Sequence, residues 1–159
     1  MSDCCKLATP EERDRNFADG IRARADQYAG TGNFAAARSL IAAAQTLLDN
    51  SGGHENESGL WLLASQANIL QRNEEADRGV AFTRQALALA EKLFPAEHPA
   101  VAVCVANLGE SLKESGDTDG ARDYIARAVK LLEDAQPTGI YTQEYIDNIL
   151  WAVRGMVQG

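Results

Sequence analysis

The sequence predicts an all-α protein, a solenoid of three helical hairpins followed by a C-terminal capping helix. Of its 159 residues, 45% are hydrophobic and only 6% aromatic, and Ala and Leu dominate the apolar set. This composition favours helices over strands. Apolar positions also recur every 42 residues along most of the chain, which indicates tandem copies of one structural unit. All four prolines fall at the boundaries of predicted helices, where a residue that opposes helix interiors is tolerated.

The second helix of each predicted hairpin shows the repeat most clearly. Ala44, Ala86 and Ala128 are 42 residues apart, and in the third copy the apolar positions follow the spacing i, i+3, i+4, i+7. That spacing places them on one face of an α-helix. The same period relates four further sets: Ala37, Gly79 and Ala121; Leu40, Phe82 and Tyr124; Ile41, Thr83 and Ile125; and Leu47, Leu89 and Leu131.

Another helix with the same period precedes each of these. Its pattern is a large residue, a small residue and a large residue, and small residues also stand at 37, 79 and 121 in the following helix. Small side chains let two helices approach closely, so each pair is expected to cross at these positions. The three matching sets are Ile21, Ala25 and Tyr28; Leu63, Ala67 and Leu70; and Val105, Gly109 and Leu112.

The turn inside each hairpin has its own signature. Gly32 and Gly116 follow the first helix at equivalent places, where a C-terminal cap favours positive φ. The middle copy has Glu74 there, with Asn73 beside it. Because Asn tolerates the left-handed conformation, we expect a weaker cap in this copy.

The joint between hairpins lies in "EKLFPAEHPAVAVC", residues 91–104. Pro95 is expected to close one helix, and His98-Pro99 to open the next, because proline suits the first turn of a helix. The predicted organisation is a flexible N-terminus (1–9), hairpins at 10–50, 57–95 and 98–135, and a capping helix at 142–157.

The predicted capping helix carries apolar residues at helical spacing, and no partner helix follows it. We expect it to cover the apolar face of the last hairpin, as terminal elements of repeat proteins do. Trp151 is expected to pack into this cover rather than remain exposed. The apolar residues are Ile146, Ile149, Leu150, Val153 and Met156.

The net charge and the search for targeting signals limit which classes of partner and which location are expected for this protein. The net charge is −8 and the pI about 4.7, which argues against nucleic acid or an anionic membrane as the main partner. The N-terminus shows no secretory signal, and no apolar run is long enough to span a membrane. Cys4, Cys5 and Cys104 form neither a disulfide framework nor a CxxC metal motif. These observations predict a cytoplasmic protein with reduced cysteines and no metal.

Three features resemble nucleotide-binding, calcium-binding or catalytic motifs, but each has a structural explanation. "GTGNFA" (30–35) fits a dinucleotide fingerprint but follows a predicted helix, where that motif needs a strand. "DTDGARD" lacks the glycine and glutamate positions of a calcium loop, so Asp117 and Asp119 are expected at a helix N-terminus. His54 and His98 lie in loops without a nucleophile. We therefore expect a non-enzyme without a cofactor.

The hairpins resemble the tetratricopeptide repeat over roughly residues 15–135. The 42-residue period and the E-K-x-x-x-P-x-x-H-P joint are similar to the long repeats of kinesin light chain, although Gly79 and Glu74 depart from the pattern. The resemblance implies a right-handed α-α superhelix, the tetratricopeptide-repeat solenoid, that binds other proteins. The key family positions read Leu108, Gly109, Leu112, Gly116, Ala121, Ile125 and Ala128.

In the family, the first helices line a concave groove that commonly holds an extended peptide. The resemblance assigns Asn68 and Asn107 to the sites where asparagines bind the ligand backbone. An amide suits this role because it both donates and accepts, but two solvated or capping asparagines would look the same. Other expected groove residues are Arg22, Asp26, Ser65, Gln71, Arg72, Glu110 and Glu114.

The groove ligand is only partly predicted. Positions where a basic clamp would hold a C-terminal carboxylate read Ala64, Tyr145 and Ile149, so chaperone-tail recognition is not expected. The acidic lean of the third repeat predicts a ligand with some Lys or Arg. Two alternatives remain: a homo-oligomerising scaffold that uses the convex face or cap, and a cytoplasmic secretion-type chaperone, suggested by fold analogy alone.

Overall fold

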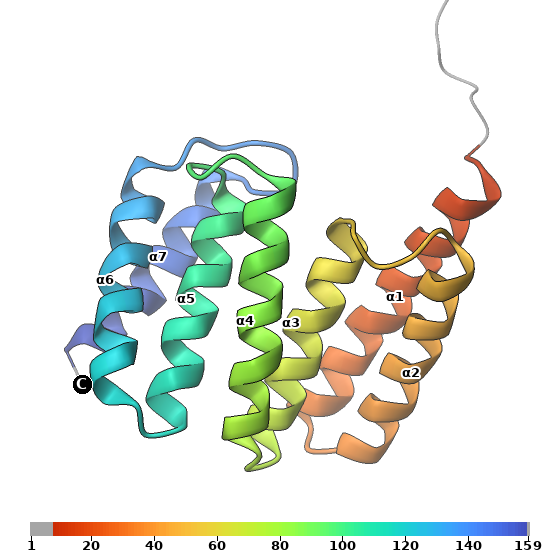
Figure 1. Ribbon diagram of the computed structural model, residues 1–159, viewed down its shortest axis with the longest axis horizontal. Helices are drawn as coiled ribbons and strands as arrows, with labels where there is room; N and C mark the ends of the chain where they lie inside the picture. Colours follow the sequence, from red (N-terminus) through yellow and green to blue (C-terminus); the bar gives the residue numbers. More distant parts are fainter. Residues whose placement is uncertain (1–7, 159) are drawn as a thin grey trace, which may run out of the picture.

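A computed structural model describes residues 8–158, which form seven α-helices (Figure 1). This confirms the predicted all-α class. Among the described residues, the one β-type contact is an isolated bridge between Thr138 and Tyr141. Most of the predicted flexible N-terminus, with Cys4 and Cys5, lies outside the described residues. The helices are α1 (Pro10–Gly30), α2 (Phe34–Asn50), α3 (Glu57–Arg72), α4 (Ala76–Leu93), α5 (Pro99–Glu114), α6 (Thr118–Asp134) and α7 (Gln143–Val157).

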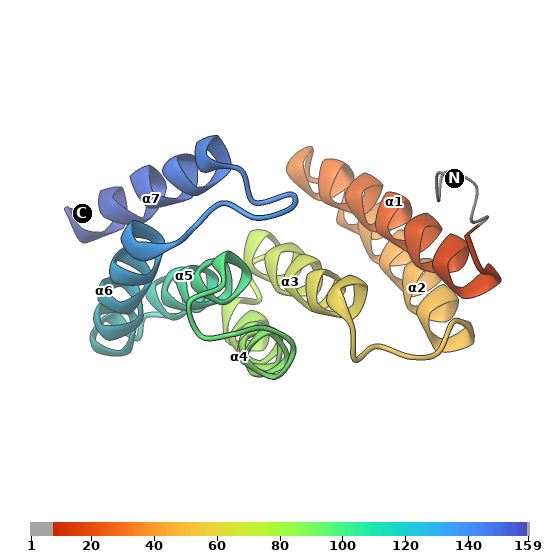
Figure 2. The ribbon, with the colours of Figure 1, turned by 90° about the horizontal axis from the view of Figure 1, so that it is seen from above.

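The helices form a solenoid with an inner and an outer row. Each of α1, α3 and α5 packs against the helix that follows it, and α3 also contacts α1 and α5. Figure 2 shows α1, α3, α5 and α7 around one concave face, with α2, α4 and α6 outside them. The first helices of the hairpins therefore line the concave side.

Local capping residues set most helix starts. At α1, the Thr9 hydroxyl accepts from the Glu12 backbone N–H, and the Glu12 carboxylate accepts from the Thr9 N–H. These bonds satisfy backbone donors that have no partner inside the helix. α4 is the exception, since Glu75 makes no side-chain cap bond. Side-chain caps at four other helices come from Asn33, Asn56, Asp117 and Thr142.

The turns follow the prediction in the first and third hairpins and differ from it in the middle hairpin. Gly32 and Gly116 have φ values of 80° and 92°. In the middle hairpin, Glu74 itself adopts φ 61°, while Asn73 stays at −95°. The turn requires positive φ at one register position, so the residue there adopts it whatever its neighbour tolerates.

Small residues allow the helices to cross closely, as the pattern predicts. A Cβ on Gly109 would lie 2.8 Å from Ile125 Cγ1 and 3.2 Å from the Ile125 backbone N. A Cβ on Gly79 would lie 3.1 Å from the Ala67 carbonyl oxygen. All three distances are shorter than ordinary van der Waals contact, so a Cβ at either site would push the neighbouring helix away, most strongly at Gly109.

The joint between the second and third hairpins confirms the role of its prolines. α4 ends at Leu93, before Pro95, and Pro99 opens α5. The N-cap is His98, whose Nδ1 accepts from the Ala100 N–H at 3.1 Å. Its ring stacks on Phe94 with centroids 4.3 Å apart, which fixes the turn.

The capping helix covers the last hairpin, but Trp151 does not take part. Ile146 and Val153 are buried, whereas Trp151 is 80% exposed. The predicted packing of Trp151 is therefore wrong. At ~100° of rotation per residue, its side chain points roughly 140–160° away from both buried neighbours.

Two hydrophobic clusters form the core, one around α1 and α2 and the other around α4 to α7, and α3 contributes to both. α5 is buried along most of its length. Over the residues that the structure describes, no helix has the length and apolar character needed to cross a bilayer.

Candidate functional site

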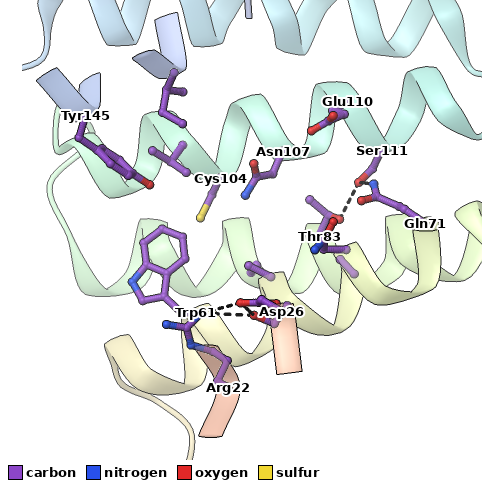
Figure 3. A pocket seen from close by; sticks show the side chains of 17 residues that line it. Arg22, Asp26, Trp61, Gln71, Thr83, Cys104, Asn107, Glu110, Ser111 and Tyr145 are labelled. Carbon is purple, nitrogen blue, oxygen red and sulfur yellow. Dashed lines mark hydrogen bonds and ion pairs between the residues drawn. The ribbon is translucent and has the colours of Figure 1, made fainter. Parts of the chain in front are cut away.

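A cavity of ≈ 270 Å³, referred to below as the groove, lies on the concave side (Figure 3). It runs along α3 and α5, with side chains from α1, α4 and α7 completing its walls. Its lining contains seven of the nine predicted site residues: Arg22, Asp26, Ser65, Asn68, Gln71, Asn107 and Glu110. The remaining lining residues are Trp61, Ala64, Ala67, Thr83, Ala86, Val103, Cys104, Ser111, Tyr145 and Ile149.

The other two predicted residues, Arg72 and Glu114, do not line the groove. Both are exposed, each one helical turn beyond a lining residue. Arg72 Nε donates to the Asn68 side-chain oxygen at 3.0 Å. Arg72 therefore acts on the groove through Asn68.

The two asparagines differ in what they leave available to a ligand. The Asn68 oxygen is already engaged by Arg72. Asn107 is half-buried, points into the groove in Figure 3, and forms no side-chain hydrogen bond with the described residues. Both the donor and the acceptor of the Asn107 amide can thus meet a ligand.

One wall holds an ion pair whose charges compensate each other. Arg22 Nη1 lies 3.1 Å from Asp26 Oδ2, which also accepts from the Ser65 hydroxyl at 2.9 Å. Desolvation raises the pKa of Asp26, although the Ser65 hydrogen bond and the Arg22 charge oppose the shift. Arg22 Nε and Asp26 Oδ1 are buried without a hydrogen-bond partner among the described residues. This wall is polar but close to neutral.

The opposite end of the groove is acidic. Glu110 lies on the lining, and Glu114 follows one turn later on α5. Desolvation raises the pKa of Glu110, and the Glu114 charge raises it further, while Arg72 opposes both. Neither carboxylate forms an ion pair with a described residue. This end therefore carries negative charge that no basic side chain of the described residues pairs with.

Sequence reasoning did not assign the aromatic end of the groove. Trp61 of α3 and Tyr145 of α7 line it, and Figure 3 shows both at the same end of the groove. Tyr141 supports both, with ring centroids 6.2 Å from Trp61 and 5.9 Å from Tyr145. Trp61 could have been found one turn before Ser65 on the same helix. The sequence held no signal for Tyr141, which comes from the α6–α7 loop.

That loop crosses the start of α3 and is fixed there by a carboxylate. The Tyr141 hydroxyl donates to Glu57 Oε1 at 2.8 Å, and Trp61 Nε1 donates to the same oxygen at 3.4 Å. The Tyr141 ring also meets His98 edge to face at 5.4 Å. The aromatic wall is thus tied to three separate elements before any ligand arrives.

A buried polar chain joins three helices beneath the groove. Gln71 donates to the Ser111 hydroxyl, which lies 2.8 Å from the Thr83 hydroxyl. Thr83 in turn donates to the Gly79 carbonyl at 2.9 Å. The chain satisfies buried polar groups and holds α3, α4 and α5 in register.

The groove contains one cysteine, and burial raises the pKa of the Cys104 thiol to about 12. A thiol of this kind is a weak nucleophile at neutral pH. Among the described residues, no group of three or more His, Cys, Asp or Glu side chains could hold a metal ion. His54 lies 2.5 Å from an Asp49 oxygen in the α2–α3 region, away from the groove.

Known proteins share this architecture. Two crystal structures of nearly identical TPR-like repeats of a putative kinesin light chain from Podosopora anserina superpose with a TM-score of 0.70. They are 18% and 17% identical to this chain and cover 91% and 92% of it, and the match covers 70% of each of them. None of the curated proteins compared with the chain matches it.

The family model of the tetratricopeptide repeat matches residues 60–134, which hold most of the second hairpin and the third. The first hairpin keeps the same 42-residue register. The second and third hairpins thus match the tetratricopeptide repeat, and the chain as a whole has the fold of the TPR-like repeats in the two solved structures.

Proposed function

We propose that the groove binds an extended segment of another protein. Tetratricopeptide repeats generally mediate contacts between proteins and are typically non-catalytic. The observation that carries the proposal is the Asn107 amide, which points into the groove with donor and acceptor both unengaged. A backbone peptide unit presents one acceptor and one donor, which match such an amide.

The walls support this role. The Arg22–Asp26 pair and the Gln71–Ser111–Thr83 chain hold polar groups in place, so binding would order few side chains. Low ordering cost favours affinity for a flexible segment. The segment itself would lose conformational freedom, and the hydrogen bonds to its backbone would offset part of that loss.

The test is a selection from a random peptide library on the immobilised protein. Selected peptides are synthesised and measured by fluorescence anisotropy against wild type, Asn107→Ala and Asn148→Ala. Asn148 is an exposed asparagine of α7 that does not line the groove, so it controls for loss of an amide. We expect Asn107→Ala to weaken binding about tenfold, because one or two hydrogen bonds are lost.

Two results would contradict the proposal. One is a library that yields no binder. The other is a set of binders whose affinity is the same for wild type and Asn107→Ala.

Cytoplasmic location and a secretion-type chaperone role stay predictions.

One observation favours a second candidate function, a homo-oligomerising scaffold. Trp151 and Val157 of α7 are 80% and 66% exposed, so two large apolar side chains of this helix are in contact with water. Two copies could cover these residues by pairing their α7 helices. Light scattering across a concentration series would then show a dimer mass for wild type and a monomer mass for Trp151→Ala. A monomer mass for wild type at all concentrations would exclude this function.

A further inference from the structure

We infer that the segment held in the groove carries an apolar side chain and, about three residues away, a basic side chain. The inference rests on the proposed function and adds the chemical class of its ligand. It follows from the unequal ends of the groove, one aromatic and one acidic.

The aromatic end is suited to an apolar side chain. Trp61 and Tyr145 lie at this end together with Cys104 (Figure 3), and Val103 and Ile149 also line the groove. Tyr145 is 37% exposed, so part of this surface meets water in the free protein. An apolar side chain placed there would remove that surface from water, which is favourable.

This end is also rigid. Trp61 is held by Glu57, and Tyr141 packs against both Trp61 and Tyr145. A preformed surface loses little freedom when a ligand is bound. The aromatic end therefore acts as a fixed subsite for one side chain.

The acidic end is suited to a basic side chain. Glu110 and Glu114 lie one turn apart on α5, and neither is paired with a basic residue in the described part of the chain. The nearby arginine, Arg72, donates to the Asn68 side-chain oxygen instead. A Lys or Arg from the ligand would supply the missing positive charge.

The register of α5 sets the separation between the two subsites. Cys104 stands at the aromatic end and Glu110 at the acidic end, six residues apart on one helix. At ~1.5 Å per residue this is about 9 Å. An extended chain advances ~3.3 Å per residue, so the distance corresponds to about three residues. Asn107 lies midway and would bind the backbone between the two side chains.

The test uses peptides from the same library selection in double-mutant cycles. In each peptide, the apolar residue is changed to Ala or the basic residue to Gln, and binding is measured by fluorescence anisotropy. The protein variants are Tyr145→Ala and Glu110→Gln. Phe17→Ala and Asp123→Asn serve as matched controls, since both residues are exposed and do not line the groove.

We expect each peptide change to weaken wild-type binding at least about tenfold. On the Tyr145→Ala protein, the apolar change in the peptide should cost little affinity, and on the Glu110→Gln protein the same should hold for the basic change. On the control proteins, both peptide changes should weaken binding as much as they do on wild type. The basic contact should also weaken with added salt. The peptide changes leave the protein intact, so they remain decisive if a protein variant folds poorly.

The outcomes separate the two claims. If binders depend on Asn107 but show no apolar and basic pair, or if the losses do not couple to Tyr145 and Glu110, this inference is wrong and groove binding stands. If binders do not depend on Asn107, or none is found, the proposed function fails and the inference fails with it.

Discussion

Gly109→Ala is the sharpest test of the close helix crossing. Gly109 lies inside α5, where alanine is intrinsically the better helix former by about 1 kcal/mol. Packing acts in the opposite direction. The added Cβ would lie 2.8 Å from Ile125 Cγ1 and 3.2 Å from the Ile125 backbone N, and Ile125 is buried. Because one of these atoms is backbone, α6 itself would have to move.

The magnitude follows from a matched pair of substitutions. Gly20 lies inside α1, and a Cβ there would meet nothing within 4 Å. Gly20→Ala should therefore raise the free energy of unfolding by about 0.5–1 kcal/mol. Gly109→Ala gains the same propensity but also incurs an overpacking cost of about 1–3 kcal/mol. The difference between the unfolding free energies of the two variants therefore measures the packing cost at the helix crossing.

The assay is urea unfolding followed by circular dichroism at 222 nm. The Gly109→Ala midpoint should fall below that of Gly20→Ala by the equivalent of about 1–3 kcal/mol. In thermal unfolding the gap should be roughly 2–12 °C, at about 2–4 °C per kcal/mol for a chain of this size. Equal stabilisation by the two alanines would refute the reasoning, because it would mean that α5 and α6 are not in close contact at Gly109.

Three further predictions concern the groove and its surroundings. Tyr141→Phe removes the hydroxyl that donates to Glu57 and should lower the free energy of unfolding by about 1–2 kcal/mol in urea. Tyr124→Phe, whose hydroxyl bonds to no described residue, should change little, and equal effects would show that the Glu57 bond contributes nothing. The folded-state pKa of Glu110 is raised, so its ionisation costs stability as the pH rises through that value. Glu110→Gln should therefore raise the urea midpoint at pH 7, with the gain vanishing below about pH 4, and a lower midpoint at pH 7 would contradict this. Burial raises the pKa of Cys104 to about 12, so in a Cys4→Ser/Cys5→Ser variant iodoacetamide should label the protein only after unfolding, as read by mass spectrometry. Labelling of the folded protein at the rate of a free cysteine would show that the Cys104 thiol is accessible to the reagent and is not buried.

The repeat register, together with the family resemblance, predicts much of the groove lining, while the role of these residues in binding stays a prediction. Residues on the first helix of each hairpin face the concave side, so the spacing that locates Ala67 and Gly109 also places Asn68 and Glu110. Register does not show how far a side chain reaches. Arg72 and Glu114 follow the same pattern but are exposed outside the groove lining.

The sequence by itself determined the helices, their pairing and their turns. These features depend on residues close together in the chain: the Thr9–Glu12 capping box, glycine at the hairpin turns, and apolar positions at helical spacing. Their physical causes are local hydrogen bonding and the allowed backbone angles, which each repeat encodes for itself.

The tertiary structure alone decided the chemistry of the aromatic end of the groove. Tyr141 meets Glu57 across 84 positions of the chain, and this contact depends on the path of the α6–α7 loop over α3. Whether Asn68 or Asn107 is unengaged depends on where Arg72 lies, and the exposure of Trp151 depends on how α7 rotates against α5 and α6. Such contacts arise from the curvature of the stacked hairpins, and no local periodicity specifies them.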